Sequence, residues 1–453
     1  MIFTIISITT IILYALFFLK NQKLSIVGVI LLLPIYLIKL NILGIPTTFL
    51  ELILIGTFTG FFYKLLKERH DIKFYNFFIP IIIFLISAII STKISSHYIS
   101  ALGILKAYII EPILFFIIFI NTFKTKKELD IIIKTLGITV IYLSIYAIFQ
   151  KITGIGIGTS DPSWAIEATR RVTSIFPYPN ALGLFLAPIV TIFLHKIIIK
   201  AQNNFKNSIL NLKTFILNNI FDFVVFITGL LAIVFAGSMG AIMGISASIF
   251  LYIFILSKDK LKYFIIGFIG FILILTLPFT YPLANKTILL GDFSGKIRTQ
   301  MWEEASNMLR NNFIFGGGLD NFKEALKPYH KKTFFELYLY PHNIILNTWS
   351  ELGFFGLLSF SFVIVIFFKK NYKIYIYKLN SFWLENAGIK NIEILKYKKE
   401  IALIISLSMF TLLIHGLVDV PYFKNDLAIL FWVIIGIGII NEKIDDNIVV
   451  IKK

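Results

Sequence analysis

The sequence predicts an all-α protein, a polytopic membrane helical bundle of about 12–13 spans with one large external loop. Of its 453 residues 57% are hydrophobic and only 15% are charged, and the mean hydropathy is +0.85. This composition excludes an ordinary water-soluble domain. Apolar runs of about 17–25 residues recur along the chain, and lysines collect in alternate connections between them.

The apolar runs give the predicted spans in chain order. They are 2–19, 24–40, 47–66, 74–91, 101–120, 129–149, 179–198, 220–236, 240–257, 262–281, 342–368, 401–418 and 426–440. The first two, and the pair around GSMG at 237–240, are the weakest. The first run has no small-residue cleavage site, so we expect it to stay in place as an anchor.

Lysine placement predicts the orientation of the bundle, because basic loops remain in the cytoplasm. The basic connections are 20–23, 67–73, 122–128, 196–213, 257–262 and 369–399. Alternation then places the segments 150–178 and 282–341 outside, and the N-terminus as well. The formal net charge of +18 is explained by topology and contact with membrane lipids, and we predict no nucleic-acid partner.

Polar residues at the predicted outer face mark three candidate site segments. In the first, Arg171 lies shortly before Asn180, at the opening of a span that begins near Pro179. A helix N-terminus with an arginine beside it can hold an anion. The alternative is an arginine whose side chain only reaches lipid headgroups.

The second segment predicts an amphipathic helix from Arg298 to Arg310, suited to the membrane interface. Its apolar face would carry Trp302 together with Met301, Ala305 and Leu309. Arg298 would stand at the helix start, where a cation is unfavourable, and this placement suggests an anionic ligand. The glycines at 316–318 would end the helix as a cap.

The third segment, PHNIILNTWSELG from 341 to 353, predicts a helix that begins near Pro341 and carries a polar stripe. The stripe contains Asn343, Asn347 and Ser350, with Glu351 beside it. Such residues must face protein or a water-filled cavity. His342, kept neutral by the helix N-terminus, is a candidate general base, and the alternative is a histidine that only caps the helix.

Two arginines and one histidine on the outer face suit a lipid-linked sugar diphosphate. Arginine grips a diphosphate with paired hydrogen bonds, and the leaving group needs them more as the sugar bond breaks. A base would take the proton of the attacking hydroxyl. The external loops lack D-x-D and H-x-x-x-H patterns, so we expect neither a metal nor another cofactor.

Four motifs together resemble the O-antigen ligase and O-antigen polymerase family over about residues 170–440. These motifs are R-x(3)-I-F-x-x-P-N from Arg171 to Asn180, R-x(3)-W with a later G-x-G (Arg298, Trp302, Gly316, Gly318), P-H-N-x-x-L-x-x-x-x-E-x-G from Pro341 to Gly353, and H-G-x-x-D from His415 to Asp419. One departure stands out, because the family carries an S-R-G arginine where this chain has Met239.

The resemblance implies a metal-independent, inverting glycosyltransferase of the type C architecture in the inner, cytoplasmic membrane. Its active site would face the periplasm or cell exterior and use an undecaprenyl-diphosphate-linked glycan. Arg171 and Arg298 would bind the diphosphate, and His342 would activate the acceptor hydroxyl. His415 and Asp419 are secondary candidates, expected to form a buried polar pair. The implied organisation is membrane spans over 1–149, a ligase-like domain over 150–440 and a cytoplasmic tail over 441–453.

Several functions remain open within and outside this family. A ligase would use a lipid A-core acceptor, a polymerase another glycan, and a protein O-oligosaccharyltransferase a protein. The large external loop before P-H-N favours the ligase. A transporter is the alternative from another class, but we see no internal repeat or midplane site of the kind that transporters carry. A structural subunit of an export complex would leave the outer arginines and histidine unexplained.

Overall fold

The protein is almost entirely helical in a computed structural model that describes residues 2–42, 45–68, 72–158, 161–167, 170–206, 212–263, 265, 267, 293–330, 337–377 and 389–444. The α-helices are α1 Ile2–Lys20, α2 Gln22–Leu31, α3 Phe49–Glu68, α4 Phe78–Ile94, α5 Tyr98–Ile104, α6 Glu111–Thr122, α7 Lys126–Thr153, α8 Pro179–Lys206, α9 Leu212–Asn218, α10 Ile220–Ala236, α11 Met239–Leu256, α14 Phe293–Asn311, α15 Phe322–Leu326, α16 Ile344–Ile376, α18 Ile389–Gly416 and α19 Asn425–Lys443. The predicted all-α membrane bundle is confirmed.

Short elements complete the fold. A π-helical turn, η2 (Leu105–Ile110), joins α5 to α6 within one span. The strands β1 (Lys39–Ile42) and β2 (Ile45–Thr48) form an antiparallel hairpin in which Ile42 pairs with Ile45. The 3-10 turns are η1 Leu33–Leu37, η3 Pro162–Ala165 and η5 Lys327–Tyr329.

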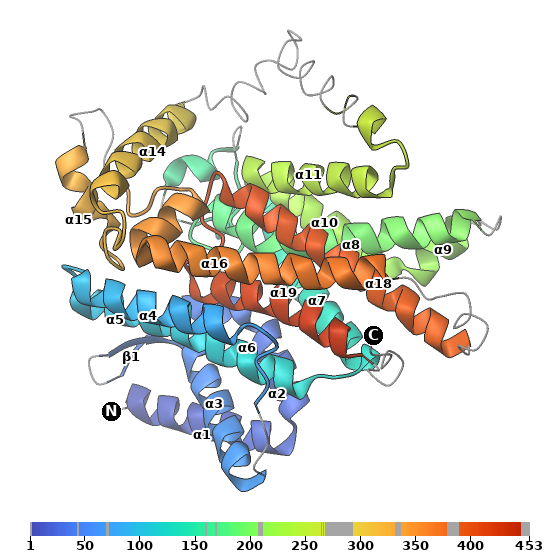
Figure 1. Ribbon diagram of the computed structural model, residues 1–453, viewed down its shortest axis with the longest axis horizontal. Helices are drawn as coiled ribbons and strands as arrows, with labels where there is room; N and C mark the ends of the chain where they lie inside the picture. The colour runs from blue at the N-terminus through green and yellow to red at the C-terminus, as the bar shows by residue number, and fades with distance from the viewer. Residues whose placement is uncertain are drawn as a thin grey trace.

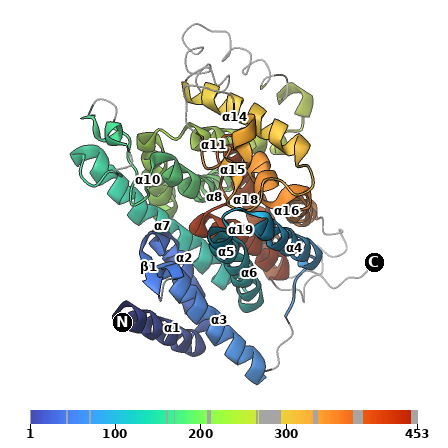
Figure 2. The ribbon, with the colours of Figure 1, turned by 90° about the vertical axis from the view of Figure 1, so that its left-hand side faces the viewer.

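The helices run mainly along the long axis of the molecule, with the N-terminus at one end and the C-terminus toward the other (Figure 1). Helices α14 and α15 cover the end from which α16 starts, which we call the α14 end. Viewed along the long axis, α1 and α3 lie at one edge, and α14 lies at the opposite edge (Figure 2). The main hydrophobic core joins buried residues of α3, α8 and α19, among them Leu50, Leu182 and Trp432.

Burial identifies the central helices of the bundle. Within the apolar windows of α19 and α8, 94% and 89% of the residues are buried, against 28% for α11. A helix that is apolar all round and buried on all sides belongs at the centre of a bundle. Trp432 and Phe431 of α19 pack on each other and, with Tyr422, on the surrounding helices.

Eight described helices are long and apolar enough to cross a membrane, or nine if the bent pair α9 and α10 counts as one span. Three shorter apolar helices, Thr4–Lys20, α2 and α4, correspond to other predicted spans. The predicted single span 24–40 is wrong. Helix α2 ends at Leu31, and Pro34 then opens the 3-10 turn η1, because proline lacks the N–H that an α-helix needs.

Some predicted segments lie outside the described residues. They are most of the span 262–281, residues 282–292 and 331–336 of the external loop, 378–388 of the basic connection and 445–453 of the tail. The remaining part of the external loop is well defined, and it carries α14 and α15.

Local sequence signals determine several helix ends. Thr125 and Glu128 form a reciprocal capping box at the start of α7, and Gly154, with φ of 75°, ends that helix in the left-handed conformation. Such a box satisfies N–H groups that would otherwise lack partners. At the start of α16 the Asn343 side chain accepts hydrogen bonds from the N–H groups of Ile345 and Leu346, which is the role expected of an N-cap asparagine.

Helix α14 packs on protein through its apolar face. Met301, Ala305, Met308 and Leu309 are buried against Phe322 and Leu326, with Leu346 and Trp349 of α16 alongside. The predicted amphipathic character is therefore present. The apolar face covers the start of α16, where Asn343, Asn347 and Ser350 lie.

The loop after α14 is hydrogen-bonded to α16 at a break in that helix. Gly353 has φ of 71° inside α16, and the Phe354 N–H bonds to the carbonyl of Ile314 at 2.9 Å. The Gly317 N–H bonds to the Ser350 carbonyl at 2.7 Å. A Cβ at Gly353 would lie 2.3 Å from the Ile314 oxygen, so only glycine suits this position.

Candidate functional site

His342 lies just before α16, in a strained backbone conformation. Its φ is 46°, a conformation that costs a non-glycine residue about 1–3 kcal/mol and persists only where surrounding contacts offset that cost. The helix begins at Ile344 with Asn343 as N-cap, so the expectation that Pro341 stands near the first helical position is wrong. Asparagine supplies the cap, and Pro341 and His342 precede it.

Neighbouring contacts hold the His342 backbone from both sides. The Trp302 Nε1–H of α14 donates to the Pro341 carbonyl at 2.8 Å. The Asn343 Nδ2 group donates to the Leu417 carbonyl at 3.0 Å. The Tyr340 ring lies 4.4 Å from the imidazole, measured between centroids. The histidine is therefore held at a defined position between α14 and the connection that follows α18.

Asp419 is the polar partner of this histidine. Its Oδ1 lies 3.3 Å from the His342 Nδ1, and its side chain is 3% exposed against 20% for His342. Burial raises the pKa of Asp419, but the hydrogen bonds from His342 and the Val420 N–H act in the opposite direction and help to bring it below its ordinary value. The Asp419 carboxyl group can therefore accept a hydrogen bond from Nδ1 and fix the orientation of the imidazole.

His415 and Asp419 of the H-G-x-x-D motif do not hydrogen-bond to each other. His415 and Asp419 are both buried, each 2% exposed, as a buried polar pair requires. The hydrogen-bond partner of Asp419, however, is His342, from 77 residues earlier in the chain. His415 instead packs against Gly240, where a Cβ would lie 2.4 Å from its Cδ2.

Arg298 is half-buried in α14, five residues after the helix start at Phe293. The expectation that it opens the helix is therefore wrong, because α14 begins earlier. Among the residues that the structure describes, its guanidinium makes no hydrogen bond or ion pair. Its charge acts on Tyr340, whose pKa is raised by burial and by Asp419 and lowered by Arg298. The Arg298 guanidinium therefore lies near Tyr340, and no described residue uses its N–H donors.

Arg171 has several protein partners. Its Nε donates to the Ala236 carbonyl at 2.9 Å, and its Nη2 donates to the Asn180 Oδ1 at 3.2 Å and the Gly237 carbonyl at 3.4 Å. It thereby satisfies carbonyls at the C-terminus of α10, where a cation is favourable. Burial lowers its pKa, and Asp161 opposes this effect. Neither Arg171 nor Asn180 hydrogen-bonds to His342.

The GSMG break connects the two parts of the site. Gly237, with φ of 61°, ends α10, and Met239 begins α11. Arg171 contacts the break at Gly237, and His415 packs on it at Gly240. Met239 is half-buried at the start of α11. The break thus contacts Arg171 on one side and His415 on the other.

The polar stripe of α16 is buried as expected. Asn347 is 1% exposed, Ser350 0% and Glu351 6%. The Glu351 carboxylate accepts a 2.6 Å hydrogen bond from the Asp320 N–H, and its backbone carbonyl accepts one from the Ser91 hydroxyl. Glu351 therefore holds the loop after α14 in place.

A cavity of about 210 Å³ lies beside Tyr340, whose ring contacts His342. Its lining residues are Ile104, Tyr108, Asp320, Leu339, Tyr340, Asn347, Glu351, Val420, Phe423 and Lys424. The buried Asn347 Oδ1 has no hydrogen-bond partner among the described residues. An unsatisfied buried amide oxygen is costly, so this wall of the cavity suits a ligand that donates hydrogen bonds.

Sequence analysis missed Lys424, Tyr178 and Tyr340. The Lys424 Nζ donates to the Tyr178 hydroxyl and lies 4.0 Å from the centre of that ring. Burial lowers the pKa of Lys424, and the charge of Asp426 opposes this effect. The Tyr178 and Tyr340 hydroxyls are 3.4 Å apart. Only the fold joins these residues, and no local motif in the sequence marks them.

The helices and this partly covered polar site define a polytopic membrane protein with a cavity at one end of the bundle. Residues 224–361 match the family model described as O-antigen ligase, which bears out the resemblance that the motifs indicated. This match supports a function of the O-antigen ligase or polymerase type, in an enzyme family related to glycosyltransferases. A search of curated proteins gave no match.

The matched segment contains only part of the candidate site. It includes Arg298, Trp302, His342, Asn343 and Glu351, while Arg171, Asn180, His415 and Asp419 lie outside it. The match therefore includes Arg298 and the segment around His342, and the domain limits at 150 and 440 remain predictions.

Proposed function

We propose that the protein transfers a glycan from undecaprenyl diphosphate to an acceptor hydroxyl, with His342 as general base. The observation that carries this proposal is the hydrogen bond between His342 and the buried Asp419, with Arg298 nearby and without a partner among the described residues. The neutral imidazole can accept a proton there, and the guanidinium can meet a leaving diphosphate.

The proposed reaction is a single displacement with inversion at the anomeric carbon. With Nδ1 protonated and bonded to Asp419, the Nε2 of His342 is free to accept the acceptor's hydroxyl proton. The hydroxyl oxygen forms the new bond to the anomeric carbon as the bond to the diphosphate breaks. The electron pair of that bond leaves with undecaprenyl diphosphate.

Arg298 would receive the leaving diphosphate, because its guanidinium has no protein partner among the described residues. A planar fork fits phosphate oxygens with paired hydrogen bonds. Arg171 already holds the α10 carbonyls, so its contribution would come through its Nη1 group. We propose that these cations neutralise the diphosphate without a metal, and activity should then persist when a chelator is added.

The cavity beside Tyr340 would receive the acceptor sugar. Aromatic side chains with a few polar groups are the usual lining of small-molecule sites, and here Tyr108, Tyr340 and Lys424 combine with the unpaired Asn347. Its volume of about 210 Å³ is below the common range of about 300–1000 Å³. We infer that it holds a single sugar ring.

We propose lipid A-core as the acceptor and the inner membrane as the location, with the α14 end facing the periplasm. The large external loop before Pro341 and the lysine distribution support this assignment. A polymerase would use the same donor chemistry with a second glycan as acceptor, and a protein O-oligosaccharyltransferase would use a protein.

The test is transfer by the purified protein from a lipid-linked oligosaccharide, comparing wild type with His342→Ala. Lipid A-core and a second donor molecule are offered separately. We expect product on lipid A-core, and a loss of roughly 100- to 10,000-fold in the variant.

Other results would change the assignment. A lengthening ladder on the donor would establish a polymerase. Near wild-type transfer by His342→Ala would remove the proposed base. Absence of product with either acceptor, while labelled lipid still crossed the bilayer, would instead favour a transporter.

A further inference from the structure

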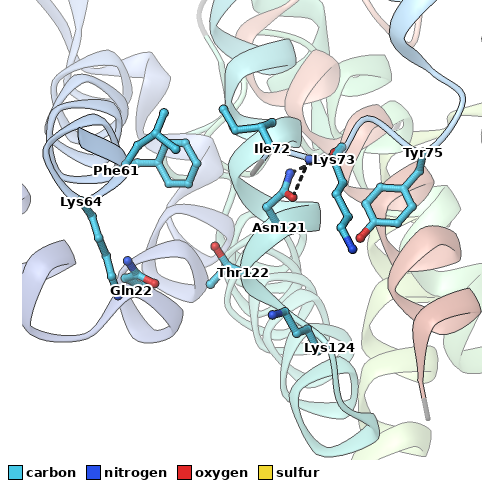
Figure 3. Close-up of a pocket in the computed structure, with 10 residues that line it drawn as sticks. Gln22, Phe61, Lys64, Ile72, Lys73, Tyr75, Asn121, Thr122 and Lys124 are labelled. Carbon is cyan, nitrogen blue, oxygen red and sulfur yellow. Dashed lines mark hydrogen bonds between the residues drawn. The ribbon is translucent and has the colours of Figure 1, made fainter. Parts of the chain in front are cut away.

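A second polar pocket lies far from the candidate site, at the opposite end of α4. The Ser95 residue after α4 meets Gly318 near the candidate site, whereas the other end of α4 follows Tyr75. The 17 residues of α4 span about 25 Å. This pocket, of about 250 Å³, is lined by Gln22, Phe61, Lys64, Leu65, Ile72, Lys73, Tyr75, Asn121, Thr122 and Lys124 (Figure 3).

Lysines from three separate segments surround the pocket. Lys64 comes from the last turns of α3, Lys73 from the connection before α4, and Lys124 from the connection after α6 (Figure 3). Lys64 lies 3.5 Å from Glu68. Lys73 and Lys124 form no ion pair with any described residue, so the pocket has an excess of positive charge.

Asn121 fixes the position of Lys73 on one side of this pocket. Its Oδ1 accepts from the Lys73 N–H at 3.0 Å, and its Nδ2 donates to the Lys73 carbonyl at 3.1 Å (Figure 3). Lys443 of α19 contacts Tyr75, and its Nζ lies 3.8 Å from the centre of the tyrosine ring. The Lys73 segment is thus attached to α6 through Asn121 and to α19 through Tyr75.

The surroundings of the lysines favour a lipid over a soluble anion. Phe61, Leu65 and Ile72 supply apolar walls to the same pocket. On α3 the neighbouring Phe62 and Leu66 are 59% and 67% exposed, as expected for side chains that face acyl chains. Basic pockets between membrane helices on the cytoplasmic side are typical sites for anionic headgroups.

We propose that this pocket binds the phosphate headgroup of an anionic phospholipid, which ties the ends of α3 and α6 to the segment before α4. Its phosphate would lie among Lys64, Lys73 and Lys124, and its acyl chains would extend along Phe61 and Leu65. The proposal is independent of the transfer reaction, and it concerns the predicted cytoplasmic face.

Native mass spectrometry and thermal unfolding of the full chain in neutral detergent test this site. Phosphatidylglycerol and phosphatidylcholine with identical acyl chains are titrated against wild type and the double variant Lys73→Gln, Lys124→Gln. Lys258→Gln with Lys262→Gln is the matched control, because it removes the same charge from the connection after α11. Equal melting temperatures without added lipid show that all three proteins are folded.

We expect wild type to prefer phosphatidylglycerol and to gain thermal stability from it. The double variant should bind it about 30-fold more weakly, since each lysine near an anionic lipid contributes about 5-fold. The control variant should retain wild-type affinity.

Three outcomes would overturn the proposal. They are equal affinity for the two lipids, an equal loss in the control variant, and lysine-dependent binding of inorganic pyrophosphate without binding of phosphatidylglycerol. The last outcome would assign the pocket to a soluble phosphate compound.

Discussion

Asp419 gives His342 its orientation, and this pairing makes a prediction at the scale of single residues. Asp419→Asn keeps the size of the side chain but removes the negative charge that fixes Nδ1. We expect kcat to fall by roughly 10- to 100-fold, the range seen for partners that orient metal-binding histidines, with little change in the acceptor KM. Transfer kinetics measure both values. A raised KM with unchanged kcat would show that Asp419 shapes the acceptor site instead.

The two arginines should respond differently to replacement by lysine. Arg298→Lys keeps the charge but loses the fork, so transfer should fall by roughly 100-fold or more, with an unchanged melting temperature. Arg171→Lys removes hydrogen bonds to the Ala236 and Gly237 carbonyls, and it should cost about 1–3 kcal/mol of stability. Transfer assays and thermal unfolding separate the two effects. Identical behaviour of the two variants would contradict the structural role of Arg171.

At the scale of elements, the broken helix α16 determines where the loop after α14 can dock. Gly353→Ala places a Cβ 2.3 Å from the Ile314 oxygen in a left-handed conformation, so we expect a loss of about 1–3 kcal/mol and reduced transfer. Unfolding of the purified variant provides the measurement.

Gly103→Ala is the matched control for that helix break. Gly103 lies in α5, and a Cβ there meets nothing within 4 Å. Since alanine favours helix, this variant should be neutral or more stable by up to about 1 kcal/mol. A Gly353→Ala protein as stable as Gly103→Ala would show that the loop does not depend on the α16 break.

For the whole molecule, the arrangement of the two ends makes a topological prediction. The chain contains no cysteine, so single cysteines can be labelled without background. Lys323→Cys, at an exposed position of α15, should react with an impermeant reagent from outside, and Lys260→Cys, after α11, only from the cytoplasmic side. Reversed labelling would invert the bundle and exclude a periplasmic site.

The sequence alone predicted features that depend on local or compositional physics. Apolar run length predicted most helices, and helical spacing correctly predicted the buried faces of α14 and α16. The start of α16 was not predicted correctly, because the helix was expected to begin near Pro341 and Asn343 is its cap. The broken second span shows the limit, because Pro34 divides a run that is apolar throughout.

Tertiary structure decided which of the marked residues meet. His342 pairs with Asp419 across 77 positions, Arg171 is occupied by the end of α10, and Lys424 joins the cavity although no motif contains it. Spans of similar apolar composition can pack in many orders, so periodicity shows which face of a helix is buried but not which helix covers it. The sequence therefore determined the class of protein and its polar segments, while packing determined the partners that give each side chain its role.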